Sequence, residues 1–476
     1  MDDVQIIRSK SDVYALVNSG QLASRRSLMI ILIALGGTFI DAYDFTSLGI
    51  GAVQLKQQFH LTAFQLGSMT AAMAVGALLA ALIGGYYVDR IGRLKMFMLD
   101  LVFFVVSAVA AALSPNLGWL LVFRFLMGVG VGLDFPAALS FVAEYTGLQR
   151  KGRSVNMWQM LWYIAASVGF LVIVPVYLLG VGPNLWRWAV GIGAIPAVIV
   201  LILRYKFMDE SPMWAASRGN LREAARVLEE AYGIRAVVAD NADAPELTPP
   251  LSSIKEYAQL FSPRYRGRTA LASVIGFTQS MEYFAVGFYL PTISLLIFGK
   301  KFLFAILGAA VFNLFGILGG YINVKNTQKV GIRRLAIIGY IGVLTSLILI
   351  GFLAHVLPVL VVGLLVAMFI VAHSMGQGAT GMTMGTMSYP TPIRGVGAGF
   401  TQGIIRVGSI LGFYFFPLVL AVAGLQHTLL LIGLVPLFGL IVTLLIPWDP
   451  TGKDIDQEEV GESLVPAKSG LNVKPY

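Results

Sequence analysis

The sequence contains no cysteine and little charge. The absence of cysteine excludes disulfide bonds and metal sites built on thiolates. Charged residues make up only 12% of the 476 residues, whereas 57% are hydrophobic, and the mean hydropathy is +0.78. These values lie outside the range of a water-soluble domain and indicate a protein surrounded by lipid. There is also no His-Glu-x-x-His pair, no serine elbow and no run of metal ligands, which argues against an enzyme.

Long apolar stretches divide the chain into two sets of six. An apolar helix of about 20 residues crosses the hydrocarbon layer of a bilayer. Stretches of this kind cover residues 28–50, 64–88, 96–113, 117–141, 155–180 and 187–205, and then 269–297, 302–324, 335–354, 358–386, 396–422 and 426–447. The sequence therefore predicts an all-α membrane protein with twelve transmembrane helices. Two six-helix bundles, residues 28–205 and 269–447, are joined by a polar linker at residues 206–268.

The distribution of basic residues predicts the topology. The net charge of +9 comes largely from alternate loops, with Arg90, Arg93 and Lys95 as one example. Since basic loops stay in the cytoplasm, both ends should be cytoplasmic: the segment 1–27, whose following span is expected to be retained, and a tail at 448–476 without regular structure. The expected location is the plasma (inner) membrane. The positive charge thus reflects topology, and no nucleic-acid partner is expected.

Charged residues in mid-membrane are the first candidate functional groups. Each costs about 2.5–3.5 kcal/mol to insert, so each needs a partner or a function. Asp41 and Asp44 lie three residues apart on one helix face, and two such close carboxylates do not readily both ionise. One alternative is a purely structural pair with Arg124. The hypothesis for proton coupling comprises Asp41, Asp44, Asp134, Arg124 and Glu282.

Polar faces on some spans, absent from others, predict an aqueous cavity between the helices. A guanidinium on its wall, Arg406, is suited to hold a carboxylate, although a counter-ion role toward Glu282 is the alternative. His373 is open to three readings: proton relay, substrate hydrogen bond or packed polar residue. The proposed substrate-binding residues are Arg406, Gln159, Trp162, Tyr163, Gln279, Glu282, His373, Gln377 and Gln402.

Two motifs resemble those of a known superfamily. The run Gly85-x-x-x-Asp89-Arg90-x-Gly92-Arg93 resembles the loop between helices 2 and 3 of the major facilitator superfamily, and a weaker copy follows the eighth span. The run from Leu120 to Gly130, with Arg124, resembles that superfamily's helix 4 motif, associated there with proton coupling. The resemblance implies a major facilitator fold with a gating loop formed by Gly85, Asp89, Arg90, Gly92 and Arg93.

Further motifs indicate which branch of the superfamily the sequence resembles. Glu210-Ser211-Pro212 resembles the sugar-porter-like branch, and Asp41-Ala-Tyr-Asp44 resembles aromatic-acid and metabolite:proton symporters. The resemblance implies alternating access, proton-coupled symport of a small organic anion, a monomer, and no cofactor besides the proton gradient. The alternatives are a sugar, polyol or phosphate symporter, a proton-driven drug exporter, and a transporter-like sensor. The reduced polar pattern at Gln279 and Glu282 weighs against a hexose, and Phe135 weighs against phosphate.

Overall fold

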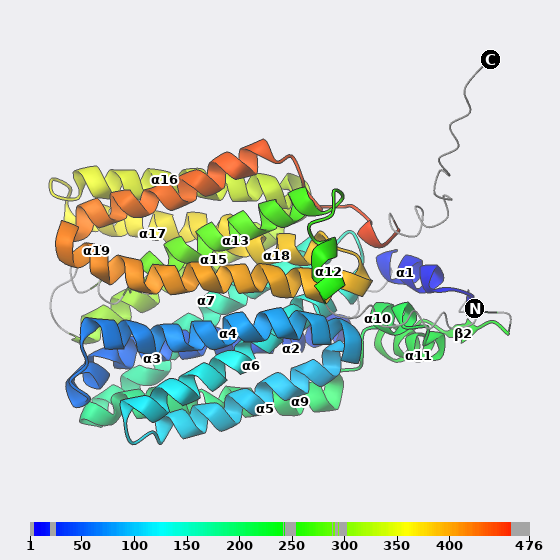
Figure 1. Cartoon of the computed structure of the whole chain (residues 1–476), viewed down its shortest axis with the longest axis horizontal. Coiled ribbons are helices and arrows are strands. Elements are labelled where there is room, and N and C mark those ends of the chain that lie inside the picture. The colour runs from blue at the N-terminus through cyan, green and yellow to red at the C-terminus, as the bar shows by residue number, and fades with distance from the viewer. Residues whose placement is uncertain are drawn as a thin grey trace, which may run out of the picture.

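The computed structural model describes residues 4–19, 25–240, 242, 254–287, 289–290, 294 and 302–457. Long helices run side by side along the longest axis of the molecule (Figure 1). The short helices α1 (Lys10–Asn18), α10 (Pro212–Ser217) and α11 (Leu221–Tyr232) lie beyond one end of this bundle, here called the α1 end, and α12 (Ile254–Gln259) lies at the same end beside α19. The other end is called the opposite end.

The first half contains six spans, two of which are broken. The first span consists of α2 and α3, separated at Leu35, and the sixth consists of α8 and α9, separated at Gly193. The helices are α2 (Arg25–Ala34), α3 (Gly36–Gln58), α4 (Ala63–Ile91), α5 (Arg93–Ala112), α6 (Leu117–Glu144), α7 (Lys151–Leu178), the short 3-10 helix Gly182–Asn184, α8 (Leu185–Ile192) and α9 (Ala194–Phe207).

The second half also contains six spans. The tenth is broken at Gly376. The eleventh and twelfth spans together are labelled α19 and are separated by a kink at Gly424, which has a positive φ. The helices are α13 (Arg266–Val286), α15 (Phe302–Val330), α16 (Ile332–Leu353), α17 (Val359–Met375), α18 (Gln377–Met387), the 3-10 helix Thr391–Ile393 and α19 (Arg394–Leu445). Among the described residues, ten helical segments are long and apolar enough to cross a membrane, and the last of them, which contains α19, makes two spans. Together with α13, they make up the predicted twelve-helix membrane protein, which is confirmed.

The two halves repeat one local structure at the α1 end. Each turns sharply at a glycine with a positive φ, Gly92 (104°) and Gly331 (93°), before its third helix begins. An acid that follows the sixth span of the same half then accepts backbone N–H groups of that helix, Glu210 in the first half and Asp449 in the second. The weak sequence repeat therefore corresponds to a repeated helix cap.

The short elements at the α1 end form a small unit of their own. Strand β1 (Gln5–Ile7) pairs in parallel with β2 (Ala236–Val238), so the segment before the first span joins the linker. The helices of this unit are α1, α10 and α11, whereas α12 packs against α19. Ile7, Val13 and Leu228 lie in one apolar core of this unit. The polar stretch between the halves is therefore partly folded.

The predicted absence of structure in the tail is wrong for residues 448–457. Asp449 caps α16, Asp454 accepts a hydrogen bond from the Asn18 amide at 2.9 Å, and Asp456 pairs with Arg394 at 2.8 Å. These acids each meet a complementary donor on the bundle. The polarity of the tail suggests a solvated segment, whereas its acids in fact cap the end of a helix and pair with a buried arginine.

The two halves contact each other along two seams, with α4 against α19 and α7 against α15. Glycine permits the first contact, because a Cβ on Gly85 would lie 2.5 Å from the Gly395 carbonyl oxygen and one on Gly399 would lie 2.5 Å from that of Ala81. The α4–α19 seam thus depends on backbone-to-backbone approach.

Gly399→Val is expected to prevent closure of the α1 end and to reduce transport at least tenfold, because the added side chain collides with backbone that cannot move aside. The chain contains no cysteine, so Val396→Cys, at a position buried in the closed seam, can report opening through labelling by a hydrophilic maleimide. The matched control is Gly363→Val, where a Cβ meets nothing within 4 Å. Equal labelling of both variants would contradict the prediction.

Candidate transport site

Asp44 and Arg124 form a buried ion pair inside the first half. The Arg124 Nη1 group donates to the Asp44 carboxylate, and both side chains are at most 1% exposed. The Nε and Nη2 atoms of Arg124 have no hydrogen-bond partner within the described part of the chain. One of the two helix 1 acids thus neutralises the helix 4 arginine, as the structural alternative expected, and the other does not.

Asp41 instead pairs with Arg406 across the two halves. The Arg406 Nη2 atom lies 2.9 Å from Asp41 Oδ2, and both side chains are 1% exposed. In the amide orientation that its neighbours require, the Gln402 oxygen accepts hydrogen bonds from Arg406 Nε and Nη2 at 3.2 and 3.0 Å. The rings of Phe45 and Phe135 flank the guanidinium, each with its centroid 5.6 Å away. The alternative of Arg406 as the counter-ion of Glu282 is therefore wrong.

Glu282 belongs to a separate polar group in the second half. Its Oε1 atom lies 2.9 Å from His373 Nδ1 and accepts a hydrogen bond from the Gln377 amide at 2.5 Å. The Tyr283 ring stacks on the His373 ring at 5.1 Å. Gln377 reaches Glu282 because the tenth span is broken at Gly376, next to it. Three predicted site residues, from spans 7 and 10, thus meet.

The remaining predicted residues are distributed over both halves. Gln159 is buried, and its Oε1 atom has no hydrogen-bond partner among the described residues. Gln279 is also buried, and Tyr163 meets Tyr283 edge-on at 6.0 Å. Asp134 lies apart, because its carboxylate pairs with Arg204 at 2.6 Å. Asp134 and Arg124, which the sequence groups as candidates for proton coupling, therefore have separate ion-pair partners, Arg204 and Asp44.

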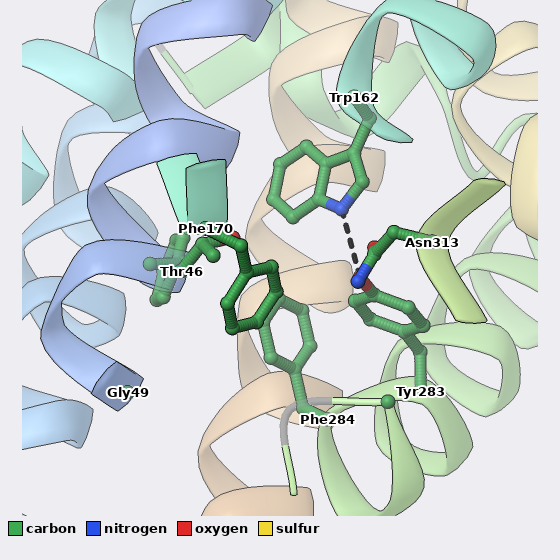
Figure 2. Close-up of a pocket in the computed structure, with 9 residues that line it drawn as sticks. Thr46, Gly49, Trp162, Phe170, Tyr283, Phe284 and Asn313 are labelled. Atoms are coloured by element: carbon green, nitrogen blue, oxygen red, sulfur yellow. Dashed lines mark hydrogen bonds between the residues drawn. The ribbon is translucent and has the colours of Figure 1, made fainter. Parts of the chain in front are cut away.

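A pocket lies on the side of these charges that faces the opposite end. Its residues come from both halves: Phe45, Thr46, Gly49, Trp162, Phe170, Tyr283, Phe284, Gly287 and Asn313. Aromatic rings and the Asn313 amide surround the hollow in Figure 2, where the Trp162 indole donates to the Tyr283 hydroxyl at 3.0 Å. The hollow encloses about 380 Å³ of empty space, including some that is open to the outside. Phe45 separates the pocket from Arg406, so an aromatic layer covers the charged centre.

The α1 end is closed by a charged network between the halves. Asp89 accepts the backbone N–H groups of Gly395 and Val396 at 3.0 and 2.9 Å, so a carboxylate from α4 caps the first turn of α19. Arg93 Nη2 lies 3.0 Å from the Asp89 carboxylate and 2.7 Å from that of Glu144. The predicted gating loop thus makes contact across the halves.

The residues of the predicted gating loop have different roles. Gly85 permits close packing and Gly92 makes the turn, whereas Arg90 donates to the hydroxyl of its neighbour Tyr86 and lies outside the charged network. The charged network also contains three residues that the predicted site did not include: Glu144, Arg394 and Asp456. Arg394 lies 3.2 Å from Glu144 and 2.8 Å from Asp456. Buried acids at helix ends close to basic residues were the available signal.

Asp456→Asn is expected to destabilise the protein at neutral pH by roughly 3–5 kcal/mol, because it leaves a buried Arg394 underpaired. Burial raises the pKa of the Asp456 carboxyl, but Arg394 and Lys151 outweigh burial and hold the pKa below the ordinary 3.8. The stabilisation is therefore present above pH 3.8 and is lost as the pH falls through the depressed value.

Unfolding of detergent-solubilised wild type and Asp456→Asn at pH 7 and in strong acid tests this dependence, with a difference that shrinks in acid. Asp209→Asn is the control, since Asp209 pairs with a half-exposed Arg226 at 3.4 Å and should lose less than about 1 kcal/mol. An equal difference between wild type and Asp456→Asn at both pH values would exclude the titration of Asp456 as its cause.

Two six-helix bundles that meet over buried ion pairs, closed at one end and hollowed toward the other, define a membrane transporter. Residues 34–389 match the model of the Major Facilitator Superfamily, and the chain belongs to that superfamily. It is accordingly a multi-pass transporter and not an enzyme. In the part of the chain that the structure describes, no three His, Asp or Glu side chains gather in a way that could hold a metal ion.

The chain is similar to transporters of metabolites and of sugars. It is 28% identical to the putative metabolite transport protein YaaU of Escherichia coli, over 90% of this chain and 93% of that protein. It is 27% identical to the niacin transporter NiaP of Acinetobacter baylyi, over 80% and 84%. The fold is similar to that of the proton:xylose symporter XylE bound to 6-bromo-6-deoxy-D-glucose, with a TM-score of 0.75 and 19% identity, over 91% of this chain and 98% of that one.

Proposed function

We propose that the protein is a proton-coupled symporter of a small organic anion. The observation that carries this proposal is the Asp41–Arg406 pair, which joins the two halves beneath the aromatic layer. A substrate carboxylate can bind the guanidinium in the same way as Asp41, with two parallel hydrogen bonds. Binding of the anion then displaces Asp41. A displaced carboxylate in a dry site is stabilised by taking a proton, so one proton enters with each anion.

Asp44 provides a second step. When it takes a proton, its ion pair with Arg124 is lost, and helices α3 and α6 of the first half can shift relative to each other. A bare carboxylate facing a closing, dry site is costly, so the loaded and protonated form favours occlusion. Each acid thus has its own cation, Arg406 for Asp41 and Arg124 for Asp44.

The aromatic wall favours a ring-bearing acid. The ring centroid of Phe45 lies 6.2 Å from that of Trp162 and 5.3 Å from that of Phe284, a spacing that suits a flat apolar group. The relative named a niacin transporter handles such a molecule, a carboxylic acid on an aromatic ring. A ring between these side chains would lie close to Arg406, whose guanidinium packs on Phe45.

A sugar or polyol symporter is the second candidate. Other relatives are named a glucose transporter, an arabinose-proton symporter and a major myo-inositol transporter. Buried amides suitable for hydroxyl groups are present around the centre, namely Gln159, Gln279, Gln377 and Gln402. Gln159 Oε1 makes no hydrogen bond within the described residues, so it is free to accept one.

Thermal stabilisation of the purified protein distinguishes the candidates. Benzoate, nicotinate, small aliphatic acids, phosphate, xylose and inositol are compared at pH 5.5 and 7.5. At 100 times its Kd a ligand stabilises by about 2.7 kcal/mol, and the anion proposal expects an aromatic acid to do so more strongly at the lower pH. Stabilisation by a sugar alone would replace the anion proposal by the second candidate.

The proposal places the α1 end in the cytoplasm and the chain in the plasma (inner) membrane, as a monomer. The basic loops at that end, with Arg90, Arg150 and Lys151 near helix termini, support this orientation. The pocket then opens outward. A hydrophilic maleimide added outside intact cells should label Thr46→Cys in the pocket and not Val396→Cys in the closed seam.

A further inference from the structure

We propose that Asp100, Asp134 and Arg204 form a proton-binding site inside the first half, separate from the transport site. Arg204 bridges the two acids: its Nη1 lies 3.2 Å from the Asp100 carboxylate and its Nη2 lies 2.6 Å from that of Asp134. All three side chains are buried, with Asp134 at 6% exposure and the others at 0–1%. The residues come from spans 3, 4 and 6.

The charges in this triad do not balance. Two carboxylates share one guanidinium, which leaves a net charge of −1 if both acids ionise. The two carboxyl groups are also close enough to repel each other when both are ionised. A buried, uncompensated carboxylate is strongly unfavourable, so a single bound proton is the arrangement that neutralises the site.

One acceptor atom remains free for that proton. Asp134 Oδ2 makes no hydrogen bond within the part of the chain that the structure describes. It faces α3 at Gly37, where a Cβ would lie 2.1 Å from this oxygen. A small cavity lies beside it, bounded by Gly37, Ile40, Asp100, Leu101, Phe104, Gly130, Val131 and Asp134. Its wall is otherwise apolar, which excludes a hydrated ion and leaves the proton as the ligand.

The triad is tied to the break in the first span. Arg204 Nη2 donates to the Ala34 carbonyl at 2.8 Å, and Nε reaches the Ile33 carbonyl at 3.5 Å, immediately before Leu35 separates α2 from α3. These carbonyls lie at the C-terminal end of α2, where intrahelical donors are missing. Loss of the proton would redistribute the hydrogen bonds of Arg204 between the acids and this break. The site therefore links a protonation state to the helix that carries Asp41 and Asp44.

Neighbouring charges do not neutralise the triad. Asp41 on α3 is close enough to repel Asp134, whereas the cations Lys95 on α5 and Lys206 on α9 are exposed. On α6, Arg124 is paired with Asp44 and Glu144 with Arg93. The second acid thus meets no further described cation, and the additional repulsion from Asp41 favours the proton-bound form.

Infrared spectroscopy that compares purified wild type and variants tests the site. Because no substrate is added, failure of the transport proposal does not affect the result. Asp100→Asn and Asp134→Asn each leave one acid with one guanidinium. Each is expected to remove one protonated-carboxyl band present in the wild type at pH 7, and to show a Tm at pH 8 no lower than the wild type. The control Glu229→Gln, at an exposed acid, should leave the bands unchanged.

The double variant Asp100→Asn/Asp134→Asn leaves Arg204 buried without an acid and is expected to have a clearly lower Tm than either single variant. If the wild-type carboxyl bands persist in both single variants, or if both single variants are as unstable as the double, two ionised carboxylates are needed and the proton site does not exist. Loss of the band together with the retained single-variant Tm supports the proposal.

Discussion

Arg406→Gln is expected to lower the affinity for the transported anion by about 30-fold or more, because truncation of a buried, hydrogen-bonded charge pair costs about 2–5 kcal/mol. The change also leaves Asp41 without its cation. For this reason the informative variant is Arg406→Gln combined with Asp41→Asn, which removes both charges and keeps polar groups of similar size. Isothermal titration with the acid found in the stabilisation screen measures the effect.

Two further affinity measurements, on Arg406→Lys and with a neutral sugar, help to interpret that result. Arg406→Lys keeps the positive charge but loses the planar, bidentate geometry, so its affinity should fall between those of the wild type and the neutral variant. A neutral sugar needs no guanidinium, and its affinity should change far less in the double variant. Unchanged binding of the anion by Arg406→Gln/Asp41→Asn would remove Arg406 from the substrate site.

Asp44→Asn is expected to weaken accumulation driven by a pH gradient, to the level that the proton on Asp41 alone supports, while substrate exchange persists. Asparagine resembles the protonated acid in shape and still offers an oxygen to Arg124, but it cannot release a proton. With a proton on each acid, the wild type couples two protons to each anion, whereas the variant keeps only the proton on Asp41. For each pH unit of gradient, the loss of one proton should lower the accumulation ratio in proteoliposomes by about tenfold.

Counterflow and net uptake, measured on the same vesicles, separate coupling from inactivation. Glu229→Gln serves as the control, because Glu229 is an exposed acid on the short helix α11, outside the membrane spans. If Asp44→Asn still accumulates substrate at the wild-type ratio, the coupling proton binds elsewhere. If it loses counterflow as well, Asp44 is required for the conformational change itself.

The sequence was sufficient for the twelve-span fold, because each span had to be apolar along its whole length whatever its neighbours. It could not predict all of the local breaks. Gly376 interrupts the tenth span and places Gln377 beside Glu282, and nothing in the apolar pattern distinguishes this glycine from the others nearby. The folded contacts of Asp454 and Asp456 were missed for a related reason: the acids are polar in sequence and buried only through distant partners.

For the charged residues, the sequence predicted the depth in the membrane and the helix face, but it did not predict the ion-pair partners. Asp41 and Asp44 were placed correctly on one helix, yet they bind different arginines, Arg406 and Arg124, from different halves. Pairing depends on the rotation and separation of helices, which helical periodicity does not determine. Arg204 was overlooked because a basic residue near a helix end is ordinary in a membrane protein. Its two acids on other spans are visible only in the fold.

The two seams between the halves differ in chemistry. Along α4 and α19 the α1 end is held by Asp89, Arg93 and backbone N–H groups, whereas further along α7 the hydrogen bonds to α15 and α18 join neutral groups. There Asn156 bonds Thr327 at 3.0 Å, and the Trp158 indole donates to the Ala379 carbonyl. Water entering the first seam hydrates ions and so returns much of the free energy lost when the pairs separate. Opening and closing can therefore be nearly equal in free energy, which allows a carrier to turn over repeatedly without becoming trapped in either state.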